Sequence, residues 1–522
     1  MNSLSAESLA AALAIIGVVI IISALLSGLI DRSGLPQVAV FLALGAAIGP
    51  FGLRMLDISL ESPTLRVVAT LSLALVLFTD AVTLNIAEVR RRSALTFRLL
   101  GPGTLLTAAL IALSGWWVLD LPVPAAAILG AALASNDPVL LRGLLRRRDI
   151  PADARHALQL ESGLNDVTLL PVVIVAMAFY GRGSPLGGAG LAKLGLDLFI
   201  LGPGAGILVG LLGVAALDLI RKKIGVRRDY ESLYSLGIAF TAFAAAEAVH
   251  GSGFLAAFAA GMTIAALDVE LCDCFVEYGG VTAEMLLLFT FVLLGSSLIW
   301  SGFTVISGAT LLFTAIVVVI RTPVYLLSLL GSGVDMRGRL LIAWFGPRGL
   351  SSLLLVLLPV FAGLPGSGEL FSICSLAVLV SVVLHGGSPM LLARAARKKA
   401  MREDPSIAAN AVVSPFEAQP PSVELHPTPD DGTASTDDVA APQLDAENDA
   451  EAIGSQRISI EGLRRLWKTN EPVVILDVRT KRSLEGADSQ AKGAVRLPPD
   501  HVAERAKELG LDKEAWLIAY CA

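Results

Sequence analysis

Charged residues are scarce in this sequence. Only 16% of its 522 residues are Asp, Glu, Lys or Arg, whereas 54% are hydrophobic, and the mean hydropathy is +0.71. Soluble domains carry about 25% charged residues, so this composition excludes a protein whose main solvent is water. The apolar residues come in blocks of roughly 20, the length of helix that crosses about 30 Å of hydrocarbon. We therefore predict an all-α polytopic membrane protein surrounded by membrane lipid.

Cysteine is also scarce, and its spacing excludes two further kinds of protein. The four cysteines, Cys272, Cys274, Cys374 and Cys521, are too few and too scattered for a disulfide scaffold. Cys272 and Cys274 lack the matching second pair that a structural zinc site requires. We expect no cofactor and no nucleic-acid partner.

A basic segment is missing before the first apolar run, Leu9–Leu29. The run is also longer than the core of a secretory signal, so we expect it to remain as the first of about 13 transmembrane helices. The predicted ranges are 9–30, 36–52, 63–86, 96–118, 122–145, 157–181, 193–219, 232–249, 253–268, 282–300, 303–330, 338–363 and 370–394.

Basic residues are segregated among the loops between these ranges. With 13 helices, one side of the membrane carries five basic groups: Arg90–Arg92, Arg146–Arg148, Arg221–Lys223, Arg337 with Arg339, and the tail Arg394–Lys399. Loops rich in Lys and Arg stay in the cytoplasm. The prediction is a multi-pass protein of the inner (plasma) membrane, with the N-terminus outside and the C-terminal tail in the cytoplasm.

The composition changes after the last apolar block, which suggests three domains. Residues 1–400 form the predicted membrane domain. Residues 401–455 are rich in Pro, Ser, Thr, Asp and Glu, which is typical of a flexible acidic linker. Apolar runs return at Val473–Leu476 and Trp516–Tyr520, so 456–522 is predicted to be a small partial α/β module.

Ionisable residues within the apolar ranges mark the candidate site, because each is costly in hydrocarbon unless it is paired or hydrated. The densest groups are Ser135-Asn136-Asp137-Pro138 and Glu161-Ser162-Gly163-Leu164-Asn165-Asp166. In the second group, residues four apart share a face of a helix, which gives two neighbouring polar stripes. Such a face needs a wet cavity.

Proline interrupts two of the predicted helices. Pro138 should unwind the fifth range near Asn136 and Asp137, where freed carbonyls could bind a cation, and Phe345–Gly349 should break the twelfth. The twelfth range is the seventh predicted helix after the fifth. Because seven is odd, the two helices cross the membrane in opposite senses. Crossed discontinuous helices of this kind indicate two inverted repeats with a transport site between them. Two proline kinks without function are the alternative.

Arg321 lies deep within the eleventh range and needs a partner. The predicted topology places it in the same membrane half as Glu161, so we expect a structural ion pair between them, which would leave Asp166 free to titrate. Snorkelling of Arg321 to the surface is the alternative. For Glu247, His250 and His385, packing or interfacial roles are favoured over pH sensing.

These motifs resemble the sodium/proton exchangers of the monovalent cation:proton antiporter-1 group, which are NhaP-like in bacteria. The resemblance covers about residues 10–395. It includes the two polar groups above, Gly251-Ser252-Gly253-Phe254-Leu255-Ala256 and Gly346-Pro347-Arg348-Gly349.

The resemblance implies a role for each residue of the site. Asp166 would bind a proton and a cation alternately, with Asn165 typical of electroneutral exchange, and Asp137 and Ser162 would help coordinate the cation. Glu161 would pair with Arg321, Arg348 would belong to the helix crossing, and Asp80 would lie near the cytoplasmic funnel. A homodimer is also implied.

The function predicted from these residues is secondary active exchange of a monovalent cation for H+. The cation is Na+, with K+ and Li+ as alternatives. Because proton and cation compete for one buried carboxylate, their movements are coupled, and rocking of one helical bundle exposes the site to each side in turn. A passive cation channel and a membrane-tethered sulfurtransferase-like regulatory protein are the alternatives. No enzymatic activity is expected.

The last segment resembles a rhodanese-like domain. The resemblance lies in Val474–Arg479, in Lys492–Asp500 and in the ending Ala519–Ala522, where Cys521 stands at the position of the nucleophile. The anion-binding loop that should follow this cysteine is absent from the sequence, so sulfurtransferase activity is not expected.

Overall fold

The computed structural model describes most of the membrane domain and three strands of the C-terminal part. The described residues are 37–403, except for 57, 85, 139, 142–149, 182–186, 224–227 and 268–272, then 473–478, 494–497 and 516–520, with three isolated positions before residue 37. The chain divides into two units, residues 1–417 and residues 418–522, which are described separately below.

The described part of the first unit is built of helices, as its apolar blocks predict. Their bounds in chain order are α2 (Gln37–Ile48), α3 (Pro63–Thr83), α4 (Ile86–Arg91), α5 (Ser93–Arg98), η1 (Leu99–Leu105), α6 (Leu106–Val118), α7 (Val123–Ala134), α9 (Ala152–Tyr180), α10 (Gly188–Leu196), η2 (Asp197–Leu201), α11 (Gly202–Lys223), α12 (Arg228–Ala248), α13 (Gly253–Ala266), α14 (Asp273–Ser296), η3 (Leu298–Val305), α15 (Gly308–Ser328), α16 (Met336–Trp344), α17 (Leu350–Phe361) and α18 (Ser367–Glu403).

Many of these helices can cross a membrane. Six of the described helices are long and apolar enough to do so, or seven if α14 and η3, which are bent by 48°, form one span. Five shorter apolar helices of 10–17 residues accompany them. Every predicted range from the second onward contains a described helix. The first range, 9–30, lies outside the described residues, so the number 13 stays a prediction.

The start of the eleventh predicted range is wrong. The sequence analysis begins that helix at residue 303, but residues Leu298–Val305 form the 3₁₀ helix η3 and α15 begins at Gly308. The physical reason is a capping box, in which the Ser307 side chain accepts a hydrogen bond from the Thr310 amide and the Thr310 side chain accepts one from the Ser307 amide. Such a box fixes the first turn of a helix more firmly than hydropathy does.

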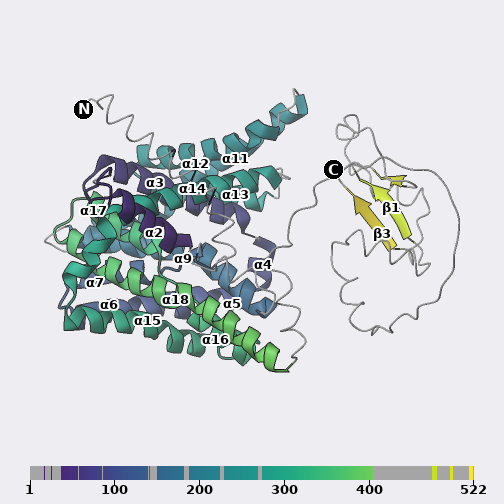
Figure 1. The fold of residues 1–522 in the computed structure, drawn as a ribbon. Helices are drawn as coiled ribbons and strands as arrows, with labels where there is room; N and C mark the ends of the chain where they lie inside the picture. Colours follow the sequence, from purple (N-terminus) through teal and green to yellow (C-terminus); the bar gives the residue numbers. More distant parts are fainter. Residues whose placement is uncertain are drawn as a thin grey trace. The chain divides into compact units, whose positions relative to one another are not determined.

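The helices pack as two groups (Figure 1). The first bundle consists of α2, α3 and α11–α14, and the second bundle consists of α5 with η1 and α6, α7, α9 and α15–α18. Within the first bundle, α2 approaches α14 so closely that a Cβ on Gly45 would collide with the backbone at Val292 and Gly295. Small residues allow this approach, which is how helices gain contact where the solvent is lipid. Between the bundles, α3 contacts α9 and α17.

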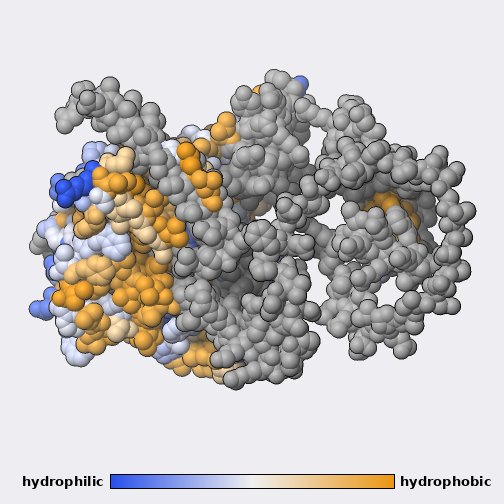
Figure 2. All heavy atoms as spheres, viewed as in Figure 1, coloured by the Kyte–Doolittle hydropathy of each residue, from blue (hydrophilic) through white to orange (hydrophobic). Residues whose placement is uncertain are grey.

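The outer surface of the first unit is apolar. Figure 2 shows hydrophobic residues gathered in a broad area on the visible face. Large side chains such as Trp117, Leu212 and Phe199 are 81%, 61% and 61% exposed. Continuous exposed surface of this kind is unfavourable in water and matches a hydrocarbon environment.

The second unit contains a small parallel sheet. Its strands are β1 (Val473–Asp477), β2 (Val495–Arg496) and β3 (Trp516–Tyr520), in the order β2-β1-β3, with Val473 opposite Trp516. Asp477 at the end of β1 is fully buried and pairs with Arg496 at 3.4 Å. The predicted strands are present. Cys521 lies outside the described residues, and the rhodanese-like character of the unit stays a prediction.

The boundaries of the predicted domains also stay a prediction. Helix α18 continues through Glu403, past the predicted border at residue 400. The rest of the predicted linker, 404–455, lies outside the described residues.

Candidate functional site

Two broken helices meet in the second bundle. Helix α7 ends at Ala134 and is followed by the extended segment Ser135–Asp137, while α16 and α17 are separated by the non-helical segment Phe345–Gly349. Both breaks fall where Pro138 and Pro347 predict them. The broken segments are joined directly, since the Asp137 amide donates to the Pro347 carbonyl at 2.9 Å.

The charges at this crossing complement the helix ends that meet there. Asp137 Oδ2 accepts a hydrogen bond from the Leu350 amide at 2.7 Å and so caps the first turn of α17, where a negative charge is favourable. Gly349 lies against this carboxylate and has no room for a Cβ. Arg348 lies near the carboxyl ends of α7 and α16. Its guanidinium donates to the Gly346 carbonyl and, at 3.3 Å, to Asn136 Oδ1.

Asp166 lies on α9 beside this crossing and is 2% exposed. The Ser135 hydroxyl donates to its Oδ1, and the Ser351 hydroxyl lies beside the carboxylate, but Oδ2 forms no well-aligned hydrogen bond. No ion pair of Asp166 occurs among the described residues. A buried carboxylate without a cationic side chain is expensive, so this position favours a neutralising proton or cation.

Oxygen atoms dominate the immediate surroundings of Asp166. The Asn165 side chain is fully buried and donates to the Asn136 carbonyl at 3.2 Å, which leaves Asn165 Oδ1 buried without a hydrogen bond. The Asn136 carbonyl oxygen, Asn165 Oδ1, the Ser135 hydroxyl and Asp166 Oδ2 are all hard oxygen ligands. Alkali and alkaline-earth cations prefer ligands of this type. The structure thus brings Asn136, Asn165 and Asp166 together.

Glu161 lies on the same helix in a contrasting environment. Arg321 Nη1 and Nη2 donate to its two carboxylate oxygens at 2.6 and 2.9 Å, and both side chains are at most 2% exposed. Asn136 and the Tyr325 hydroxyl, the latter at 2.6 Å, also donate to Glu161 Oε1. Arg321 therefore lies in the interior and does not snorkel, and its bidentate contact neutralises Glu161.

Sequence reasoning missed three residues of this arrangement. Tyr325 follows Arg321 by four positions and therefore shares its helix face, a signal that could have been used. Ser135 stands in the motif beside Asn136, and the sequence analysis assigns it no role. Ser351 carries no signal in the sequence, since it comes near Asp166 only through the helix crossing.

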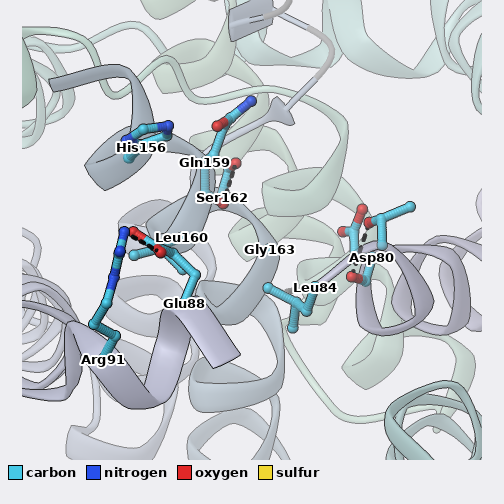
Figure 3. Close-up of a pocket in the computed structure, with 10 residues that line it drawn as sticks. Asp80, Leu84, Glu88, Arg91, His156, Gln159, Leu160, Ser162 and Gly163 are labelled. Carbon is cyan, nitrogen blue, oxygen red and sulfur yellow. Dashed lines mark hydrogen bonds and ion pairs between the residues drawn. The ribbon is translucent and has the colours of Figure 1, made fainter. Parts of the chain in front are cut away.

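A cavity of about 530 Å³, whose lining includes Arg91, lies at one end of the unit (Figure 3). Arg92 forms an ion pair with Asp153 beside it, and Arg90 and Arg155 are close in the sequence, so we call this the arginine-rich end. The lining residues are Asp80, Thr83, Leu84, Glu88, Arg91, His156, Gln159, Leu160, Ser162 and Gly163. The cavity ends at Gly163, three residues from Asp166. The Ser162 hydroxyl donates to the Gln159 carbonyl at 3.2 Å, so it faces the cavity rather than Asp166.

Ion pairs link α4 to α9 at the mouth of this cavity. Arg91 and Arg92 contact Glu88 at 2.6 and 2.5 Å, and Arg92 also contacts Asp153 at 2.8 Å. The Arg91 hydrogen bond lowers the pKa of Glu88. The mouth therefore holds charges of both signs.

The opposite end of the unit is closed to Asp166. A second cavity of about 540 Å³ lies there, and on α9 it reaches only to Ile174. At 1.5 Å per residue, the two cavities end about 4.5 Å and about 12 Å from Asp166 along α9. Leu169, Leu170 and Val173, all 0% exposed, fill the longer gap. The cavity at the arginine-rich end therefore comes nearer to Asp166 along α9 than the opposite cavity does.

Comparison with known proteins places these features in context. The family model described as "Sodium/hydrogen exchanger, transmembrane" matches residues 18–394. The chain is 28% identical over 389 residues to the K(+)/H(+) antiporter NhaP2 of Shewanella sp. (strain MR-4), covering 72% of this chain and 65% of that protein. It is 28% identical over 303 residues to the Na(+)/H(+) antiporter NhaH of Halobacillus dabanensis, covering 54% and 72%. The chain thus spans 65% of the length of the NhaP2 relative.

The fold has a counterpart among solved structures. It is similar to the sodium proton antiporter MjNhaP1 from Methanocaldococcus jannaschii at pH 8, with a TM-score of 0.60 and 23% sequence identity. The similarity covers 73% of this chain and 98% of that one. At this identity the likeness concerns the architecture of the helices.

Proposed function

Because this chain belongs to the sodium/hydrogen exchanger family, we propose that it exchanges a monovalent cation for protons across a membrane. The relatives are named for K+/H+ and Na+/H+ antiport, so Na+ and K+ are the proposed cations, with Li+ as a further candidate. The observation that carries the proposal is Asp166, a buried carboxylate that forms no ion pair among the described residues and lies three residues along α9 from the inner end of a cavity.

The mechanism follows from the cost of a bare buried charge. Asp166 is stable in the interior when a proton or a cation neutralises it, and one site cannot hold both. Exchange is the result, because the site moves across the membrane only in one of these two loaded forms. Since Arg321 neutralises Glu161, Asp166 is the carboxylate proposed to bind the proton, and one such carboxylate would give an electroneutral exchange of one cation for one proton.

The surrounding residues have proposed roles that follow from their positions. Asn165 and the Asn136 carbonyl supply oxygen ligands beside Asp166, and Asp137 holds the crossed helices while contributing negative charge to the site. Asp80 and Ser162 line the cavity through which the cation approaches. Among the described residues the two cavities do not join, which favours alternating access over a passive channel.

The proposed setting is the inner membrane, with the arginine-rich end in the cytoplasm. Clusters of Arg and Lys remain on the cytoplasmic side during insertion, and Arg90–Arg92, Arg155 and Arg337 all follow this rule. The cavity that reaches Gly163 would then be open to the cytoplasm. A homodimer is proposed from the family resemblance.

The test uses the full chain in sealed proteoliposomes with an imposed pH gradient and a pH-sensitive dye. Addition of Na+, K+ or Li+ should dissipate the gradient for at least one cation. Asp166→Asn should abolish this signal, whereas Glu369→Gln, an exposed carboxylate at the start of α18, should keep it. Exchange that survives in Asp166→Asn contradicts the proposal.

A further inference from the structure

His385 is a buried histidine that the proposed exchange mechanism does not use. It lies on α18, is 4% exposed, and its ring is centred 5.2 Å from the ring of Trp344. Its Nδ1 atom lies 3.1 Å from the hydroxyl oxygen of Ser381, one helical turn earlier. Packing alone would place a hydrophobic residue here, so the hydrogen bond needs an explanation.

Ser381 has a second hydrogen-bond partner besides His385. The Ser381 oxygen lies 2.8 Å from the Arg348 backbone nitrogen, and a backbone N–H can only donate. Ser381 therefore accepts from Arg348, and its own proton is available for His385. The hydroxyl has one proton and two lone pairs, so it can accept from the Arg348 amide and form a hydrogen bond with either tautomer of His385 at the same time.

The group that Ser381 holds is one end of a single peptide unit. The Arg348 N–H and the Pro347 C=O belong to the same planar peptide bond, and they point in opposite directions. The Pro347 carbonyl accepts from the Asp137 amide at 2.9 Å, while the Arg348 N–H donates to Ser381. This peptide plane is thus fixed by the broken helix α7 on one side and by α18 on the other.

We propose that His385 is a positioning residue for exchange. By orienting the Ser381 hydroxyl, it fixes the rotation of the Pro347–Arg348 peptide plane and so the register of the two broken helices beside Asp166. The amide of Arg348 lies in a break where no helical carbonyl can accept it, so Ser381 supplies its acceptor. This proposal rests on the proposed exchange function.

One test follows the Arg348 amide itself and needs no transport. Hydrogen–deuterium exchange of the segment 345–350 is measured on the full chain in lipid nanodiscs. Ser381→Ala and His385→Leu should each speed exchange at this segment, and His385→Asn, whose amide oxygen can accept the Ser381 proton, should not. Ser375→Ala is the matched control, because Ser375 is a buried hydroxyl on the same helix without a hydrogen-bond partner. Equal protection in wild type, Ser381→Ala and His385→Leu overturns the proposal.

A second test measures cation dependence in proteoliposomes. His385→Leu and Ser381→Ala should each raise the half-saturating cation concentration about three- to ten-fold, the factor expected for one hydrogen bond. The double variant should raise it no further than the single variants do, because all of them remove the same hydrogen bond. His385→Asn should stay within about two-fold of wild type. Additive effects, or an Asn variant as impaired as Leu, overturn the positioning role. If the wild-type protein shows no cation/proton exchange, the proposed function is contradicted. The hydrogen–deuterium exchange measurement still tests the role of His385 in that case.

Discussion

Two buried carboxylates on α9, five residues apart, have opposite environments. Glu161 is surrounded by donors from Arg321, Tyr325 and Asn136, whereas Asp166 receives hydroxyl contacts and, from the part of the chain that the structure describes, no cationic partner. Both are at most 2% exposed. Burial therefore does not distinguish a structural acid from a transporting one. The distinction lies in whether the protein supplies the neutralising charge or leaves that to a proton or an ion.

The largest expected effect comes from removing the charge that is paired. Glu161→Gln leaves Arg321 as an uncompensated buried cation, and breaking such a pair destabilises a protein by about 3–5 kcal/mol. We expect a strongly lowered unfolding temperature in detergent, or failure to accumulate. Asp166→Asn, which removes an unpaired charge, should keep or raise the unfolding temperature. If both variants have the same unfolding temperature, the conclusion that Glu161 and Asp166 differ in how their charge is neutralised is wrong.

The same comparison can be sharpened with a double variant. Replacing Glu161 by Gln and Arg321 by Met together removes both charges, so the double variant should be more stable than Glu161→Gln alone. Thermal unfolding of the three proteins measures the difference. A double variant that is less stable than Glu161→Gln would show that Arg321 contributes mainly through its contacts with Tyr325 and the Ile342 carbonyl.

The sequence predicts much of this contrast, because the relevant residues stand in local motifs. The helix breaks fall at Pro138 and Pro347, which lack a backbone donor and crowd the preceding turn, and the pairing of Glu161 with Arg321 follows from the cost of isolated charge in lipid. The contacts of Asp137 could not be predicted. Its partner, the Leu350 amide, is 213 residues away, and only the three-dimensional crossing brings a helix N-terminus to the carboxylate.

The role of Asp137 at the crossing predicts a moderate effect. Asp137→Ala removes the cap of α17 and should lower the free energy of unfolding by about 1 kcal/mol, whereas Asp137→Asn keeps an oxygen acceptor and should cost less. Unfolding measurements in detergent distinguish these variants. Exchange should fall in both, because both lose the negative charge proposed for the cation site. Full exchange in Asp137→Asn would limit this residue to capping.

A smaller effect is expected at the cavity that leads to the unpaired acid. Asp80 lines this cavity at a half-buried position, and its charge should raise the local concentration of cations. Asp80→Asn should raise the half-saturating cation concentration about two- to three-fold at low ionic strength and leave the maximal rate unchanged. The effect should shrink in high salt with an untransported cation, because salt screens exposed charges. A salt-independent change would place Asp80 in direct contact with the bound ion.

The smallest effect concerns Glu88, the acid at the mouth that has partners but lies near water. Because Arg91 lowers the pKa of Glu88 in the folded protein, this contact stabilises the fold above the unfolded value of about 4.5 and the contribution is lost as the pH falls below it. Glu88→Gln should therefore lower the unfolding temperature slightly at pH 7 and converge with wild type as the pH falls through the lowered pKa of Glu88 in the folded protein. Exposed ion pairs contribute little, so the change should be far smaller than for Glu161→Gln. If the difference in unfolding temperature between wild type and Glu88→Gln grows as the pH falls toward 4, the pH dependence has the opposite sign. That result would show that the folded protein stabilises Glu88 as the neutral acid.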